Sequence, residues 1–107
     1  MISEYIALLV TKDRAVGFDA TSNRFIETQL PINDELLAAE VERYAVVITS
    51  SRAFGLAAES AAFTEINLRM NESIEEIKLT YSKATVRTPD RLLTFEASGL
   101  PWKELRF

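Results

Sequence analysis

Val10-Thr-Lys-Asp-Arg-Ala-Val-Gly-Phe18 is the first of three related stretches in this sequence. The second is Ile48-Thr-Ser-Ser-Arg-Ala-Phe-Gly-Leu56, and a more divergent third is Arg87-Thr-Pro-Asp-Arg-Leu-Leu-Thr-Phe95. All three contain Thr-x-x-Arg followed by apolar residues, and their arginines are 38 and then 39 residues apart. A spacing of this size indicates a repeat protein, in which each copy forms one supersecondary unit.

The composition is that of an ordinary folded domain. The chain has 107 residues, of which 48% are apolar and 26% are charged, which is enough for one small hydrophobic core. We therefore predict a single repeat domain over residues 1–107, with repeats at about 1–31, 32–69 and 70–107. The net charge of −4 disfavours sequence-independent binding to nucleic acid or to an anionic membrane, because both require a positive surface.

Two residue types that carry much of enzyme and metal chemistry are missing. The sequence has no cysteine and no histidine, so it lacks the commonest zinc ligands, any thiolate nucleophile and the commonest general base near neutral pH. No dinucleotide-binding, phosphate-loop, nucleophile-elbow or zinc pattern occurs. We expect a protein that is not an enzyme and that uses no metal and no cofactor.

The first residues lead us to expect a cytoplasmic protein. The chain begins Met1-Ile-Ser-Glu, without a basic start, and the apolar run Ile6–Val10 is far too short to cross a bilayer. The lack of cysteine is compatible with a reducing compartment.

Each full repeat is predicted to hold four short β-strands. Lys12-Asp13 and Ser50-Ser51 are two-residue connections typical of hairpins, and Pro31 ends the strand before it because proline cannot donate to a β-ladder. The segment Leu36–Val41 has helix-forming composition, but we predict a strand because its counterpart Ile74–Thr80 is more strand-like. The first repeat begins at its second strand, and the predicted strands are 5–11, 14–19, 25–30, 36–41, 44–49, 52–58, 62–68, 74–80, 84–88, 91–96 and 102–107.

Burial patterns separate two architectures with units of this size. A β-propeller blade has four antiparallel strands in about 40 residues, whereas three copies could also close into a β-trefoil. Strands of a trefoil barrel should alternate, but Ala7-Leu-Leu-Val10 and Ala45-Val-Val-Ile48 do not, as expected of strands covered on both faces. Gly17 and Gly55 lie at equivalent positions within strands and indicate a closely packed neighbouring layer. We predict an all-β fold of propeller blades, with the β-trefoil as the alternative.

The end of each repeat also resembles a propeller blade. Phe25-Ile-Glu, Phe63-Thr-Glu and Trp102-Lys-Glu follow the last turn of each copy, as the outer strand of a blade often begins with an aromatic residue. The resemblance is to an architecture and not to a named family. It implies a closed ring of four or more blades, and an open array would leave two apolar faces in water. We therefore expect a homodimer, in which a second chain completes a six-bladed ring by two-fold symmetry.

The repeated arginines Arg14, Arg52 and Arg91 are the first candidate site. In a propeller the turns that carry them would share one rim with the linkers that hold Asn33 and Asn71. A ring of arginines could bind phosphate, a carboxylate or an acidic segment through bidentate hydrogen bonds.

A structural explanation of these arginines competes with an anion site. Glu27, Glu65 and Glu104 repeat at the same spacing, and a hairpin loop at 20–23 would place Glu27 diagonally across from Arg14. Arg–Glu pairs that hold the third and fourth strands together account for both columns of residues. We favour these pairs over an anion site.

The aromatic column, Phe25, Phe63 and Trp102, could stack on sugar rings, but we favour packing between blades because large aromatic residues dominate cores. Trp102 is the expected exception. The acidic residues Glu72, Glu75 and Glu76 are interpreted as solvated surface, because they match no calcium-binding loop.

The sequence thus predicts a non-enzymatic binding module, with its partner or ligand at the ring axis or on the rim. The alternative is a lectin-like or anion-binding protein with one site per repeat, which would use Arg14, Arg52, Arg91 and Trp102.

Overall fold

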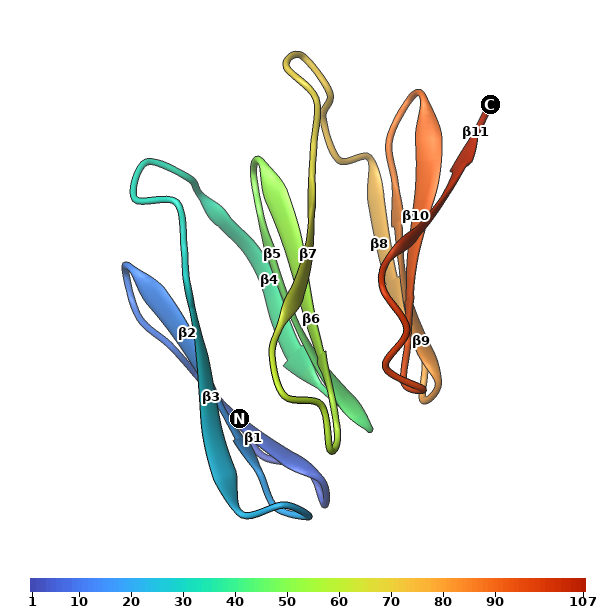
Figure 1. Cartoon of the computed structure of the whole chain (residues 1–107). Coiled ribbons are helices and arrows are strands. Elements are labelled where there is room, and N and C mark those ends of the chain that lie inside the picture. The colour runs from blue at the N-terminus through green and yellow to red at the C-terminus, as the bar shows by residue number, and fades with distance from the viewer.

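The chain is built from β-strands. The computed structural model describes residues 1–107 and contains eleven strands and no helix (Figure 1). The strands are β1 (Ile6–Val10), β2 (Arg14–Asp19), β3 (Arg24–Gln29), β4 (Leu36–Val41), β5 (Tyr44–Thr49), β6 (Arg52–Ala57), β7 (Thr64–Asn67), β8 (Glu76–Leu79), β9 (Lys83–Arg87), β10 (Arg91–Glu96) and β11 (Lys103–Arg106). Every predicted strand is present, and its predicted ends lie within two residues of the observed ones.

The strands form three separate antiparallel sheets, in which neighbours in the sequence are neighbours in space. Sheet A contains β1 to β3, sheet B contains β4 to β7, and sheet C contains β8 to β11. Sheet B lies between the other two (Figure 1). No strand of one sheet is hydrogen-bonded to a strand of another, so the sheets do not close into the barrel that a β-trefoil requires.

The uncertain segment Leu36–Val41 is a strand. It pairs with β5, and its register shifts between Leu36 and Ala38. Pairing satisfies its backbone groups and overrides its helix propensity. Sheet A has no complete strand equivalent to β4. In its place, Ile2 forms an isolated antiparallel bridge to Ala7 at the free edge of β1.

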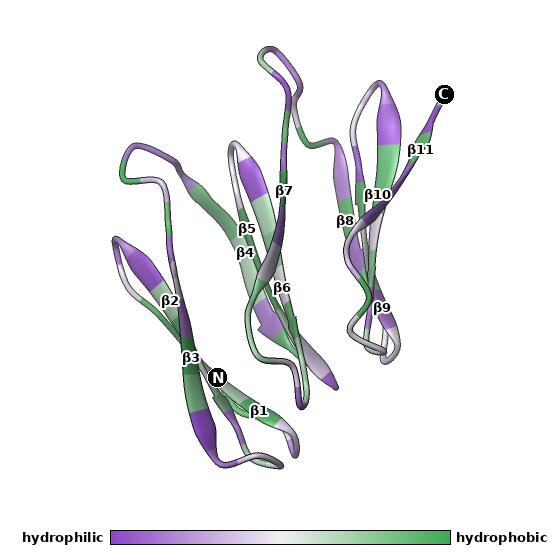
Figure 2. Ribbon diagram, viewed as in Figure 1, coloured by the Kyte–Doolittle hydropathy of each residue, from purple (hydrophilic) through white to green (hydrophobic).

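Side chains of the central sheet alternate between two cores. On β5, Ala45 and Val47 pack against sheet A, whereas Val46 and Ile48 pack against sheet C. All six residues of β5 are buried, so burial on both faces is confirmed for this strand. Each buried Val, Leu or Ile contributes about 1.5–3 kcal/mol. Figure 2 shows apolar residues, in green, along β1 and β5.

Burial on both faces was a wrong prediction for β1. Ile6 and Leu8 pack against sheet B, but Leu9 points the other way and is 62% exposed. Because the outer side of sheet A is covered by no other sheet of the chain, β1 has one buried face and one open face.

The two strand glycines let the sheets approach each other. A Cβ atom at Gly17 would lie 2.5 Å from the side chain of Leu56 on sheet B, and one at Gly55 would lie 2.6–2.7 Å from the ring of Phe95 on sheet C. Each glycine therefore receives a large side chain from the following sheet, as its position in the strand predicted. Thr94 occupies the equivalent position on β10.

Replacing Gly55 should loosen the packing of sheet B on sheet C. The Phe95 ring is fully buried and cannot swing aside, so we expect Gly55→Ala to lower the free energy of unfolding by about 1–3 kcal/mol. Gly17→Ala should cost less, because it meets the end of a flexible Leu56 side chain. Urea denaturation measures both.

Thr94→Ala is the matched control for these glycine variants, since no further sheet of the same chain faces Thr94. Its cost should stay below about 1 kcal/mol. A Gly55→Ala protein as stable as the control would show that the two sheets are not in close contact there.

Candidate functional site

The three repeated arginines form the ion pairs predicted from the sequence. Arg14 lies 3.2 Å from Glu27, and Arg52 lies 3.4 Å from Glu65. Arg91 lies 2.5 Å from Glu104. Glu27 is opposite Val16 in the register of β2 and β3, as the hairpin at 20–23 implied. Each pair therefore joins the third and fourth strands of its repeat.

Solvent exposure distinguishes the third pair from the other two. The side chains of Arg14 and Glu27 are 53% and 56% exposed, and those of Arg52 and Glu65 are 42% and 46% exposed. Exposed pairs of this kind contribute about 0–1 kcal/mol each. The side chain of Arg91 is only 5% exposed, so its charge requires more partners.

Arg91 is at the centre of a buried polar network between sheets B and C. Its Nε and Nη2 atoms donate to the two carboxylate oxygens of Glu72, each at 2.9 Å. Nη2 also donates to the backbone carbonyl of Asn67 at 2.6 Å. Thr88 Oγ1 donates to Glu72 at 2.6 Å. The network ties the linker before sheet C and the end of β7 to the turn between β9 and β10.

Glu72 is buried, and our interpretation of it as solvated surface was wrong. Its side chain is 1% exposed, whereas Glu75 and Glu76 are exposed. Hydrogen bonds from the Arg91 guanidinium are the main cause that lowers the pKa of Glu72 to about 2, against an ordinary 4.5, and burial opposes them. A bidentate arginine pair of this kind stabilises the charged carboxylate.

Asp34 has the same place in the preceding linker. It lies 38 residues before Glu72. Thr49 Oγ1 donates to it at 2.8 Å and the Ser51 backbone N–H at 3.0 Å, and the Ser51 hydroxyl also donates to it. Burial raises the pKa of Asp34, but the bonds from Ser51 and Thr49 outweigh it and lower the pKa. The recurrence of these two acids at the repeat spacing is the sequence signal that could have revealed their role.

Two more polar links join neighbouring sheets. The Tyr44 hydroxyl donates to the carbonyl of Thr80 at 2.6 Å, and burial, with a smaller contribution from Glu42, raises the pKa of Tyr44 to about 12. The carboxylate of Asp19 accepts a hydrogen bond from the backbone N–H of Glu59. The Tyr44 hydroxyl and the Asp19 carboxylate therefore both form hydrogen bonds that hold neighbouring sheets together.

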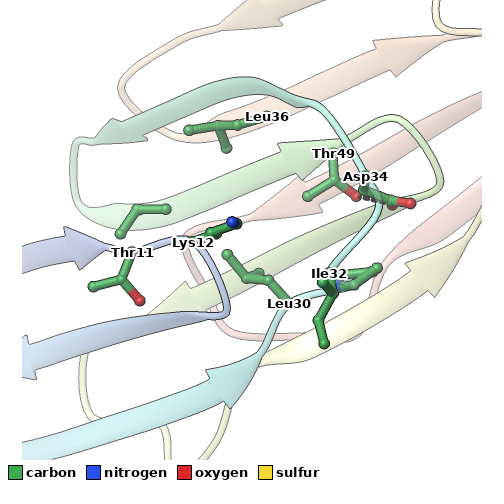
Figure 3. A pocket seen from close by; sticks show the side chains of 9 residues that line it. Thr11, Lys12, Leu30, Ile32, Asp34, Leu36 and Thr49 are labelled. Atoms are coloured by element: carbon green, nitrogen blue, oxygen red, sulfur yellow. Dashed lines mark hydrogen bonds between the residues drawn. The ribbon is translucent and has the colours of Figure 1, made fainter.

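A pocket of about 360 Å³ opens between the β1–β2 turn and the linker that leads into sheet B (Figure 3). The turn contributes Thr11 and Lys12, and the linker contributes Ile32 and Asp34. The carboxylate of Asp34 is already bonded to Thr49 and Ser51. Lys12 is thus the one cation that lines the pocket, and the one carboxylate that lines it, Asp34, already has hydrogen-bond partners.

The aromatic column packs as expected in two of its three members. Trp102 lies with its ring 5.3 Å from that of Phe95, and its Nε1 donates to the carbonyl of Thr64 at 3.2 Å. Phe63 packs against the core between sheets A and B. Phe25 is 77% exposed, so the exception is Phe25 and not Trp102.

The outer side of sheet A is an exposed apolar surface, which we call the open face. Its residues occupy the same repeat positions as those that sheets B and C bury against the sheet before them. A hollow of about 260 Å³ lies on this face and is lined by apolar residues alone, namely Met1, Ile2, Ala7, Leu8, Leu9, Val16, Phe18 and Phe25. A cluster of this kind on a surface marks a site of association.

The outer side of sheet C mixes charged and apolar residues, although the sequence led us to expect two apolar faces. Leu105 is 62% exposed on it and is paired with Leu92. Lys83, Arg87 and Lys103 project from it and are exposed. Lys103 pairs with Glu96 at 3.8 Å, and Arg87 lies over the ring of Phe107 at 5.7 Å. The two ends of the stack of sheets therefore differ in chemistry.

Comparisons with known proteins add no family. No family model matches the chain, and no curated protein matches it. Two solved structures are similar in part. Hsv2p of Kluyveromyces lactis has 10% identity and a TM-score of 0.41, and the match covers 98% of this chain and 35% of that one. Hsv2 of K. marxianus has 13% identity and a TM-score of 0.39, with 97% and 34% covered. The chain thus spans about a third of the length of these structures.

Two kinds of feature are absent from the structure. It contains no helix long and apolar enough to cross a membrane. It also contains no group of three or more acidic residues placed to hold a metal ion. Ligand binding by Arg14, Arg52, Arg91 and Trp102 stays a prediction.

Removing Arg91 should destabilise the protein far more than removing Arg14. Arg91→Ala leaves the buried Glu72 charge without its partner, and we expect a loss of about 3–5 kcal/mol in the free energy of unfolding. Arg14→Ala removes an exposed pair and should cost less than about 1 kcal/mol. Equal losses in urea denaturation would contradict the buried network.

The contribution of Glu72 to stability should depend on pH. Its pKa is about 2 in the folded protein, below its unfolded value, so its contribution is fully present above about pH 4.5 and is lost as the pH falls towards 2. The full effect is on the order of 3 kcal/mol. Unfolding free energies from pH 2 to 7 measure it.

Glu72→Gln should remove this acid-dependent component, and Glu75→Gln should keep the wild-type profile because Glu75 is exposed. If Glu72→Gln loses stability in acid as steeply as the wild type, then other carboxylates carry the pH dependence.

Proposed function

We propose that the protein is a non-enzymatic binding module whose sheets are propeller blades, and that a second chain completes their ring. The open face of sheet A is the observation that supports the proposal. Leu9 and Phe25 on it are 62% and 77% exposed, whereas their counterparts in sheets B and C are covered by the preceding sheet.

The equivalence of repeat positions supports a binding role for this face. Val47 and Val86 occupy the position of Leu9, and both are fully buried. Leu56 and Phe95 occupy the position of Phe18 and insert at the glycine positions of the preceding sheet, Leu56 at Gly17 and Phe95 at Gly55. The open face carries the same kinds of residue, so it fits a further sheet of the same type.

In the simplest assembly the second chain is another copy of this one. Sheet C of each copy would meet sheet A of the other, and two-fold symmetry would give a ring of six blades. The binding surface for a further partner would then be the ring axis or the rim formed by the β2, β6 and β10 ends. The observed Arg–Glu pairs favour this over a lectin-like or anion-binding protein with one site per repeat, because they already occupy the arginines.

Solution mass tests the proposal. Analytical ultracentrifugation should show reversible association of the 12.0 kDa chain at micromolar concentrations, with a dimer as the largest species. Leu9→Ser combined with Phe25→Ser should remove the association, because it places two polar groups on the open face.

Met70→Ser is the control, since Met70 is 91% exposed but lies in the linker before β8. This variant should associate like the wild type. A wild-type protein that remains monomeric at about a hundred micromolar would overturn the two-copy ring.

A further inference from the structure

Within one chain, the same two surfaces meet at both sheet-to-sheet contacts. One surface, which we call the glycine face, carries Gly17 on sheet A and Gly55 on sheet B. The other surface carries Leu56 on sheet B and Phe95 on sheet C, and these side chains pack at the glycines. The chain therefore has one uncovered copy of each surface, namely the outer side of sheet C and the open face of sheet A.

We propose that two copies associate through these two uncovered surfaces. This contact, which we call the seam, is weaker than the two contacts between sheets within one chain, and Thr94 sets its strength. This inference rests on the proposed two-copy ring. In that ring Thr94 of one copy lies opposite Phe18 of the other, at the position where both internal contacts have glycine.

Steric exclusion at this position follows from the internal contacts. At Gly55 even a Cβ atom would lie 2.6–2.7 Å from the Phe95 ring, which is closer than carbon atoms pack. Thr94 adds a branched side chain to the same position. Phe18 of the second copy therefore cannot sit against β10 as Phe95 sits against β6, and the two sheets meet less closely.

Two charged residues of the seam weaken it in the same direction, whereas Leu92 and Leu105 add apolar surface to it. Ile48 is fully buried at its internal contact, but the equivalent residue of sheet C is Arg87, which pairs with Glu75 in the monomer. Likewise Tyr44, also fully buried, is replaced by Lys83. The seam therefore has charged residues at two positions that are apolar in the contact between sheets B and C, and it displaces these charged groups from water.

The polar connection made at the internal contacts is also different at the seam. Thr49 and Thr88 bond to Asp34 and Glu72 from the linker that precedes each sheet. Thr11, at the same position in sheet A, bonds to Asp13 of its own turn at 3.1 Å. Thr11 is therefore bonded within its own turn, whereas Thr49 and Thr88 are each bonded to a carboxylate of the preceding linker.

The experiment compares self-association of the wild type with that of Thr94→Gly by analytical ultracentrifugation. Thr94→Gly should bind its second copy about tenfold more tightly or better, because it restores the space for Phe18. Thr94→Ala is the matched control and should give little gain, since a Cβ atom alone already overlaps at Gly55. Circular dichroism confirms that each variant is folded.

Phe18→Ala placed in the Thr94→Gly protein should cancel the gain, which shows that the two positions meet across the seam. A gain that survives Phe18→Ala would overturn the inference. Dimers of equal strength in wild type and Thr94→Gly would overturn the weak seam but leave the two-copy ring standing. Monomers in both at about a hundred micromolar would overturn the ring and the seam together.

Discussion

The structure depends on the burial of both faces of sheet B. With no helix present, apolar surface can be removed from water only where one sheet covers another. Sheet B therefore supplies side chains to two cores, and this requires strands such as β5 that are buried at every position. Close approach of the layers then requires glycine wherever the next sheet inserts a large side chain, which is the role of Gly17 and Gly55.

Polar links between the sheets fix the relative position of the sheets more than they raise the free energy of unfolding. A buried carboxylate such as Glu72 is costly to desolvate, and its bonds to Arg91 and Thr88 mainly offset that cost. What the links do fix is position, because each joins a linker to one particular turn of the following sheet. Asp34 and Glu72 thus hold the sheets in one relative register that apolar packing alone would leave free.

The sequence predicted the features that every repeat shares. It missed the features that depend on whether a repeat lies at the end or in the middle of the three sheets. Strand positions and the Arg14–Glu27 pair follow from periodicity and hairpin register, which are local. Glu72 was misread because three nearby acids suggest surface, and only its distant partner Arg91 explains its burial. Leu9 and Val47 occupy equivalent positions but have opposite exposure, since exposure depends on whether a neighbouring sheet is present.

The difference between the two ends of the stack has a physical consequence for assembly. A head-to-tail contact forms closed rings only if its rotation closes, and otherwise it propagates into filaments. A strong seam would stabilise both outcomes alike. In the proposed assembly, with Thr94 and Arg87 at the seam, one contact alone would be weak. A closed pair of copies would make two contacts at once, and the second would gain from a high effective concentration. In that assembly the closed ring would prevail over an open chain wherever this effective concentration exceeds the concentration of free chains.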